Sequence, residues 1–138
     1  MLVLLLESII EIEGGESLTK KLLENNVVYK INCNNCDSSY VGQTKRQLFE
    51  RVDEHQNNIN HAPKNHNVIT KHILAHGHSI DWQGVRIVDK ESDLDKRLVS
   101  ESININLQSS PINLRKDTEK LNASYNTVLV KFRRNSIS

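Results

Sequence analysis

The sequence predicts a small domain of the α/β (α+β) class, in which an antiparallel sheet is flanked by helices. Two patterns support this fold. The run Val27–Ile31 is β-branched and aromatic, and a second strand pattern follows it after a turn-prone segment, as expected of a hairpin. Helical and strand patterns then alternate along the chain. The 138 residues, of which 37% are apolar, suffice for one domain with a modest core.

The predicted hairpin comes first. Its strands cover Val27–Ile31 and residues 39–42 (SYVG), and the segment NCNNCDSS between them is rich in turn-forming Asn, Asp and Ser. Because side chains alternate along a strand, Tyr29 and Ile31 share one face of the first strand. The second strand carries Tyr40, so each strand of the hairpin contributes one tyrosine.

A helix follows the hairpin. Thr44 and Gln47 fit a capping box, so we expect this helix to begin at Thr44 and to end near Asn58. Arg51 and His55 are four residues apart, which places them on one face of the helix.

Three further elements complete the predicted order. We expect a short helix over Val68–Ala75, ended by Gly77, and then a strand over Val85–Val88. The last helix has one face at regular helical spacing, formed by Leu94, Leu98, Glu101 and Ile105. A carboxylate thus lies within an otherwise apolar stripe.

The termini are assigned to flanking segments. Residues 1–24 are interpreted as an N-terminal appendage, with the alternative that a helix over Leu18–Leu23 packs on the domain. The domain itself is assigned to residues 25–117 and a C-terminal tail to residues 118–138. The tail has one strand-like run, Thr127–Phe132, and we expect its end to be disordered.

Charge and cysteine usage limit the function classes. A net charge of +1 neither favours nor excludes nucleic acid as a partner, so any phosphate-binding surface must be local. The leading run MLVLLL is too short to span a membrane, and we expect no membrane partner. Two cysteines three positions apart favour a metal or redox role in a reducing, intracellular compartment.

A metal site is one candidate. Cys33 and Cys36 precede two imidazoles, His72 and His78, and Cys2His2 is a standard set for structural zinc. Such a site would join two distant elements and stabilise a small core. His76, four residues after His72, is a rival ligand. The alternative is that the thiols are unrelated to surface histidines.

A phosphodiester-cleaving site is the second candidate. Such a reaction needs a cation for the phosphate, a group that activates or positions water, and stabilisation of the leaving oxygen. Arg51 can bind phosphate with its forked guanidinium, and Tyr29 or His55 can serve the water. Tyr40 lies on the neighbouring strand. The alternative for Arg51 and His55 is an ordinary solvated helix face.

Glu101 is ambiguous on sequence alone. A carboxylate in an apolar stripe is costly unless it is paired or bound to metal. It is either a ligand for magnesium or manganese, or an edge residue that reaches solvent or pairs with a base such as Arg97.

The ordered set of motifs resembles the GIY-YIG endonucleases. The residues that carry the resemblance are VVY at 27–29, YVG at 40–42, Arg51, His55 and Glu101. With a Cys-x-x-Cys between the two tyrosine motifs, the run VYKINCNNCDSSYVGQTKRQLFERVDEH looks like the version found in Penelope-like retroelements. The resemblance covers residues 27–117, although Val27 replaces the glycine that gives the first motif its name.

The resemblance implies a fold and an activity. The fold would be a three-stranded antiparallel sheet with flanking helices, and the activity would be cleavage of DNA with one divalent cation, Mg²⁺ or Mn²⁺. Glu101 would hold that cation, Arg51 would bind the scissile phosphate and Tyr29 would activate or position the water. Tyr40 would hydrogen-bond in the same pocket, and His55 would assist.

The resemblance assigns supporting roles as well. Gly42 would let the backbone turn tightly into the helix. Arg46 and Asn113 would support substrate binding. Cys33, Cys36, His72 and His78 would hold Zn²⁺ as a structural clip. The location would be intracellular, in the nucleus.

The sequence therefore predicts a divalent-metal-dependent DNA endonuclease, derived from a retroelement, that nicks DNA and carries a structural Cys2His2 zinc clip. The first alternative is a catalytically decayed, zinc-containing module that binds nucleic acid. A structural interaction domain is the second alternative, and it would require Glu101 to be solvated and Arg51 to lie away from both tyrosines.

Overall fold

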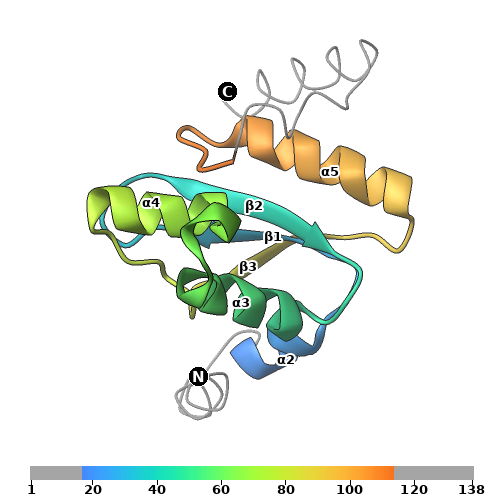
Figure 1. The fold of residues 1–138 in the computed structure, drawn as a ribbon. Coiled ribbons are helices and arrows are strands. Elements are labelled where there is room, and N and C mark those ends of the chain that lie inside the picture. Colours follow the sequence, from blue (N-terminus) through green and yellow to red (C-terminus); the bar gives the residue numbers. More distant parts are fainter. Residues whose placement is uncertain (1–16, 114–138) are drawn as a thin grey trace.

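The computed structural model describes residues 17–113 (Figure 1). The elements are α2 (Leu18–Leu23), β1 (Val27–Asn32), β2 (Ser39–Thr44), α3 (Leu48–Asn57), the 3-10 turns η1 (Asn58–Asn60) and η2 (Pro63–Asn65), α4 (Val68–His76), β3 (Arg86–Lys90) and α5 (Leu94–Leu107). Helix α5 covers one face of the sheet, and α2 and α3 lie on the opposite side (Figure 1). The predicted α+β class is confirmed.

Within residues 17–113 the sheet has three antiparallel strands, in the order β2-β1-β3. The predicted hairpin is present as β1 and β2, with Tyr29 opposite Gly42 and Ile31 opposite Tyr40. Strand β3 pairs with the other edge of β1, with a register shift between Val28 and Tyr29. Tyr29 therefore lies on the central strand, which pairs with another strand on each side.

The core is divided between the two faces of the sheet. Val27, Tyr29 and Ile31 belong to the larger cluster, which also contains buried side chains of α2 and α3. Val28 packs in a second cluster with Val41 of β2 and Ile105 of α5. This alternation confirms the predicted two-residue period of β1.

The predicted start of the first helix is wrong. Thr44 pairs with Val27 as the last residue of β2, so the chain remains extended where the capping box was expected. The Thr44 hydroxyl accepts a hydrogen bond from the Arg46 backbone instead, and α3 begins at Leu48. Gln47 occupies the N-cap without a side-chain cap and donates to the Leu23 carbonyl. Strand pairing has overridden the local motif.

The stripe predicted on α5 is only partly correct. Ile105 is buried, but Leu94 is 53% exposed, and the other buried positions are polar: Arg97 and Ser102. Arg97 donates to the Gln43 side chain and to backbone carbonyls at 91 and 92, and these hydrogen bonds offset the cost of burying its charge. The face of α5 that packs on the sheet is thus rotated from the predicted stripe toward Arg97.

The N-terminal side of the domain includes α2. Leu18 and Leu22 are buried in the larger core cluster, so the alternative of a packed helix describes Leu18–Leu23. The other predictions for the termini, including the strand-like run Thr127–Phe132, lie outside the described residues. Within residues 17–113, no helix has the length and apolar character needed to cross a membrane.

Candidate active site and metal centre

Three aromatic side chains meet between the sheet and α3. The hydroxyl oxygen of Tyr29, on β1, lies 2.9 Å from Nε2 of His55, on α3. Tyr40 of β2 packs edge-on against His55 with ring centroids 5.2 Å apart, and lies 6.3 Å from the Tyr29 ring. Both Tyr29 and His55 are buried. The structure thus brings together three residues that the sequence placed in one site.

Gly42 makes room for this cluster. A Cβ atom at Gly42 would lie 2.5 Å from the Tyr29 hydroxyl oxygen and 2.9 Å from the Tyr40 ring. The expectation that Gly42 permits a tight turn is wrong, because Gly42 lies inside β2 and its φ is not positive. Glycine is required at this position for a steric reason, because the phenol of Tyr29 occupies the space that a side chain at position 42 would fill.

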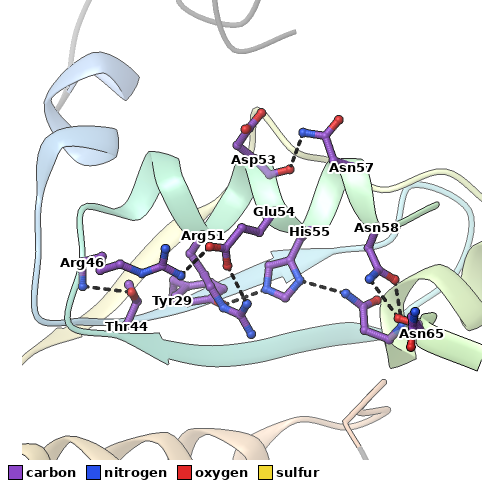
Figure 2. Close-up of polar contacts among 11 residues, drawn as sticks. Tyr29, Thr44, Arg46, Arg51, Asp53, Glu54, His55, Asn57, Asn58 and Asn65 are labelled. Atoms are coloured by element: carbon purple, nitrogen blue, oxygen red, sulfur yellow. Dashed lines mark hydrogen bonds and ion pairs between the residues drawn. The ribbon is translucent and has the colours of Figure 1, made fainter. Parts of the chain in front are cut away.

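A charged trio lies beside the cluster along α3. Arg51 contacts Glu54 at 2.9 Å, and Arg46 contacts the other oxygen of Glu54 at 2.6 Å. Figure 2 shows both arginines converging on Glu54, with Arg51 next to the Tyr29–His55 pair. Sequence reasoning missed Glu54, although its spacing of three residues from Arg51 on one helix was a usable signal.

Burial and charge keep Tyr29 and His55 neutral. Burial, followed by the proximity of Tyr40, raises the pKa of Tyr29 well above its usual range, against the opposing charge of Arg51. Burial, helped by the Arg51 charge, lowers the pKa of His55 to about 3. Burial also disfavours charge on Arg51, but Tyr29, Glu54 and Tyr40 outweigh it, so the net pKa of Arg51 is raised. Near pH 7 Arg51 is therefore a fixed cation beside two neutral groups, Tyr29 and His55.

Glu101 and Asn113 approach from elsewhere. Glu101 is half-buried on α5, and its charge is one of those that raise the pKa of Tyr29, so it acts on the same hydroxyl. Asn113 lies at the free edge of β2, where its amide donates to the Val41 carbonyl and accepts from the Val41 N–H. Asn113 therefore extends the sheet edge like a further strand residue.

A separate groove lies away from these residues. It has a volume of about 380 Å³ between α5 and β3. Its lining residues are Val88, Asp89, Lys96, Val99, Ser100, Ile103, Asn104 and Leu107. No residue proposed for catalysis or metal binding is among them.

A four-residue cluster joins the β1–β2 loop to α4. One ligand atom from each of Cys33, Cys36, His72 and His78 lies within 4.8 Å of all the others. The Cys33 sulfur is 3.5 Å from Nδ1 of His78, and the Cys36 sulfur is 3.5 Å from Nε2 of His72. Zinc bonds of about 2.3 Å to sulfur and about 2.0–2.1 Å to nitrogen place these atoms about 3.6 Å apart in a tetrahedron. The group has the geometry to hold a metal such as zinc.

Local structure positions both halves of this cluster. Gly77 ends α4 in the left-handed conformation, with φ of 65°, so the chain reverses and returns His78 toward the loop. Backbone pairing of Cys33 with Ile80 and of Asn34 with Ser79 then fixes the two segments side by side. The expected end of α4 at Gly77 is confirmed.

The ligand set and its protonation suit a metal. The ring of His76 lies 5.0 Å from that of His72, centroid to centroid, but the ligand group contains His78 rather than His76. Hydrogen bonds with Ser38 lower the pKa of the Cys36 thiol, and burial followed by the charges of His76 and His78 lowers the pKa of His72. Thiolate and neutral imidazole are the forms that bind zinc.

Comparison with protein-family models, with curated proteins and with solved structures finds no match for this chain. The features of this chain that bear on its function are consequently the ordered motifs in its sequence and the geometry of the two sites. The metal cluster is the more complete of the two, because all of its ligand atoms converge.

Proposed function

We propose that this chain is a divalent-metal-dependent DNA endonuclease of the GIY-YIG type, which hydrolyses phosphodiester bonds and nicks DNA. The observation that carries the proposal is the buried hydrogen bond between Tyr29 and His55, with Tyr40 packed against His55 and Arg51 beside them. These are the residues that the family resemblance selects. Arg51 interacts electrostatically with both tyrosines, which argues against the interaction-domain alternative.

Arg51 is the phosphate-binding group in this proposal. Its side chain is 35% exposed, so the guanidinium reaches solvent while its stem is held beside the aromatic cluster. Glu54 fixes its position, and a guanidinium remains charged at any physiological pH. A scissile phosphate would bind at the exposed side of Arg51 and place its phosphorus above Tyr29.

Hydrolysis adds one water across the phosphodiester. The water oxygen bonds to phosphorus and gives up one proton to solvent, the bond from phosphorus to the leaving sugar oxygen breaks, and that oxygen takes up a proton from solvent. Tyr29 orients the water or a phosphate oxygen through its hydroxyl, and neutral His55 holds that hydroxyl in place. Glu101 would hold Mg²⁺ or Mn²⁺, which supplies charge stabilisation when bound.

The Cys2His2 cluster would hold a structural zinc. Its four protein ligands leave no open position for a substrate, unlike catalytic zinc sites. Zinc would join the β1–β2 loop to α4 and add stability to a domain whose core is small.

Two observations favour the alternative of a catalytically decayed module that binds nucleic acid. Tyr29 is 0% exposed, and both Arg46 and Arg51 are engaged by Glu54. Catalysis therefore requires DNA to displace part of the Glu54 pairing and to approach the Tyr29 hydroxyl.

A plasmid-nicking assay tests the proposal. Wild-type protein should convert supercoiled plasmid to the open-circular form with Mg²⁺ or Mn²⁺, whereas Arg51→Ala and Glu101→Ala should each lose this activity. Arg86→Ala, at an exposed arginine of β3, is the matched control and should nick like wild type. Robust nicking by both site variants would refute the site assignment. DNA binding without any nicking by wild type would support the decayed module.

A further inference from the structure

Asn67 links α4 to the aromatic cluster. Its Oδ1 accepts a hydrogen bond from the Thr70 backbone N–H at 3.0 Å, which caps the N-terminus of α4. Its Nδ2 lies 3.4 Å from Nδ1 of His55. The two ends of one amide thus serve a helix cap and a buried imidazole.

The cap determines which way round the amide lies. A backbone N–H can only donate, so the atom of Asn67 facing Thr70 must be the oxygen. The atom facing His55 is then the NH₂ group, which only donates. Nδ1 of His55 must therefore accept, and the single ring proton of neutral His55 must be on Nε2.

The position of that proton determines the direction of the Tyr29 hydrogen bond. Nε2 of His55 lies 2.9 Å from the Tyr29 hydroxyl oxygen, so the Nε2–H group donates and the phenol oxygen accepts. The Tyr29 hydroxyl proton then cannot be directed at His55. It remains available to an acceptor on the other side of the phenol oxygen.

Asn67 is itself held in place at the end of α3. Its backbone N–H donates to Oδ1 of Asn58 at 2.7 Å, and the Thr70 hydroxyl donates to the same oxygen at 2.9 Å. Asn58 directly follows α3, the helix that carries His55. The amide of Asn67 is thus oriented by contacts at both its backbone and its side chain.

We propose that Asn67 is a positioning residue that fixes His55 in the Nε2–H tautomer and so reserves the Tyr29 hydroxyl proton for the substrate side of the site. The tautomer follows from the hydrogen-bond contacts alone, and its effect on cleavage rests on the proposed endonuclease function. Helix α4 also carries His72, so the same helix serves the metal cluster and the aromatic cluster.

Nuclear magnetic resonance measures the tautomer directly. Long-range ¹H–¹⁵N correlation spectra of zinc-loaded protein at about pH 8 distinguish a protonated ring nitrogen from an unprotonated one, and loss of signals in His55→Gln assigns the His55 resonances. Wild type should show protonated Nε2 and unprotonated Nδ1. An Nδ1–H tautomer in wild type would overturn the proposal.

Asn67→Asp is the diagnostic variant. Aspartate is an equally good N-cap, so α4 is retained, but its carboxylate only accepts hydrogen bonds. His55 should therefore carry a proton on Nδ1. Asn60→Asp, which adds the same charge at an exposed position of η1, should leave the tautomer unchanged. Retention of the wild-type tautomer in Asn67→Asp, with the Thr70 amide still protected from exchange, would also overturn the proposal.

A parallel nicking assay separates this inference from the proposed function. Asn67→Asp should slow nicking about tenfold or more, because a wrong histidine tautomer misdirects the proton that catalysis needs, whereas Asn60→Asp should be unaffected. The spectra do not require activity. If wild type has the Nε2–H tautomer but never nicks DNA, only the nuclease proposal is refuted. If wild type nicks DNA but has the Nδ1–H tautomer, only the role of Asn67 is refuted.

Discussion

Tyr29 and Gly42 face each other across β1 and β2, and the phenol of Tyr29 occupies the space where a side chain at position 42 would begin. The contact explains a glycine inside a strand, where glycine is otherwise unfavourable. It also couples the YVG motif to the first tyrosine motif by direct packing.

Replacing Gly42 with alanine should therefore destabilise the domain. The new Cβ would lie 2.5 Å from the Tyr29 hydroxyl oxygen, which forces the ring to move. We expect a loss of about 1–3 kcal/mol in the free energy of unfolding, measured by urea denaturation, as for other overpacked cores. The cost should shrink when Tyr29→Ala is added to Gly42→Ala, because the clashing atoms are gone. Simple additivity of the two substitutions would contradict this account.

The neutral state of His55 predicts a dependence of stability on pH. The pKa of His55 is about 3 in the folded protein, against 6.5 for an ordinary histidine. As the pH falls below 6.5, the unfolded chain thus binds a proton at this histidine that the folded protein does not bind. The stability contributed by neutral His55 is therefore fully present above pH 6.5 and is lost as the pH falls. Between pH 7 and pH 5 this single group should remove about 2 kcal/mol of stability.

The measurement compares wild type with His55→Gln, both loaded with zinc, by urea denaturation at several pH values. Stability of the variant should depend less steeply on pH over that interval. Because acid-linked zinc loss affects both proteins alike, the difference between their curves isolates His55. Parallel curves would show that His55 takes up its proton in the folded state at an ordinary pH.

The Cys2His2 geometry predicts about one zinc per chain. Elemental analysis of purified wild type should find it, and Cys33→Ser and His78→Ala should each reduce it strongly. His76→Ala is the matched control, because His76 contacts the other rings but is outside the ligand group. Zinc at wild-type levels in Cys33→Ser would refute the site, and loss of zinc in His76→Ala would exchange the roles of the two histidines.

Local sequence patterns predicted the parts of the fold that local physics decides. Alternation placed Tyr29 and Ile31 on one face because a strand has a two-residue period, and Gly77 ended α4 because it can adopt a positive φ. The cysteine and histidine spacings gave the ligand set, although only the chain reversal at Gly77 makes His78 fit better than His76.

Local patterns could not predict the conformation or burial of residues whose partners are distant in the sequence. Thr44 looked like a helix cap, but its pairing with Val27 keeps it in the sheet. Arg97 was considered only as a partner for Glu101, but it is 2% exposed and donates a hydrogen bond to the side chain of Gln43 on β2. Asn67, the residue before α4, could have been recognised locally only as a helix cap, because its contact with His55 depends on how α3 and α4 meet.

Removal of the Glu54 charge should increase the affinity of the protein for DNA. Its carboxylate pairs with both Arg46 and Arg51, at 2.6 Å and 2.9 Å, and so occupies the two cations nearest the proposed phosphate site. Arg46 and Arg51 also lower the pKa of Glu54, so the carboxylate stays ionised at neutral pH even though partial burial opposes its charge. Glu54→Gln should release both guanidinium groups and remove one repulsive charge. We expect binding to a short DNA duplex, measured by fluorescence anisotropy, to tighten several-fold and to become more sensitive to salt.

Glu50→Gln is the matched control, because it removes the same charge from the first turn of α3, where the contacts of Arg46 and Arg51 do not reach. It should change DNA affinity less than Glu54→Gln. The surface pairs themselves contribute little to stability, so Glu54→Gln should cost less than about 1 kcal/mol in unfolding free energy. Equal effects of the two variants would mean that Glu54 acts only through net charge, and unchanged affinity in Glu54→Gln would place the DNA-binding surface away from Arg46 and Arg51.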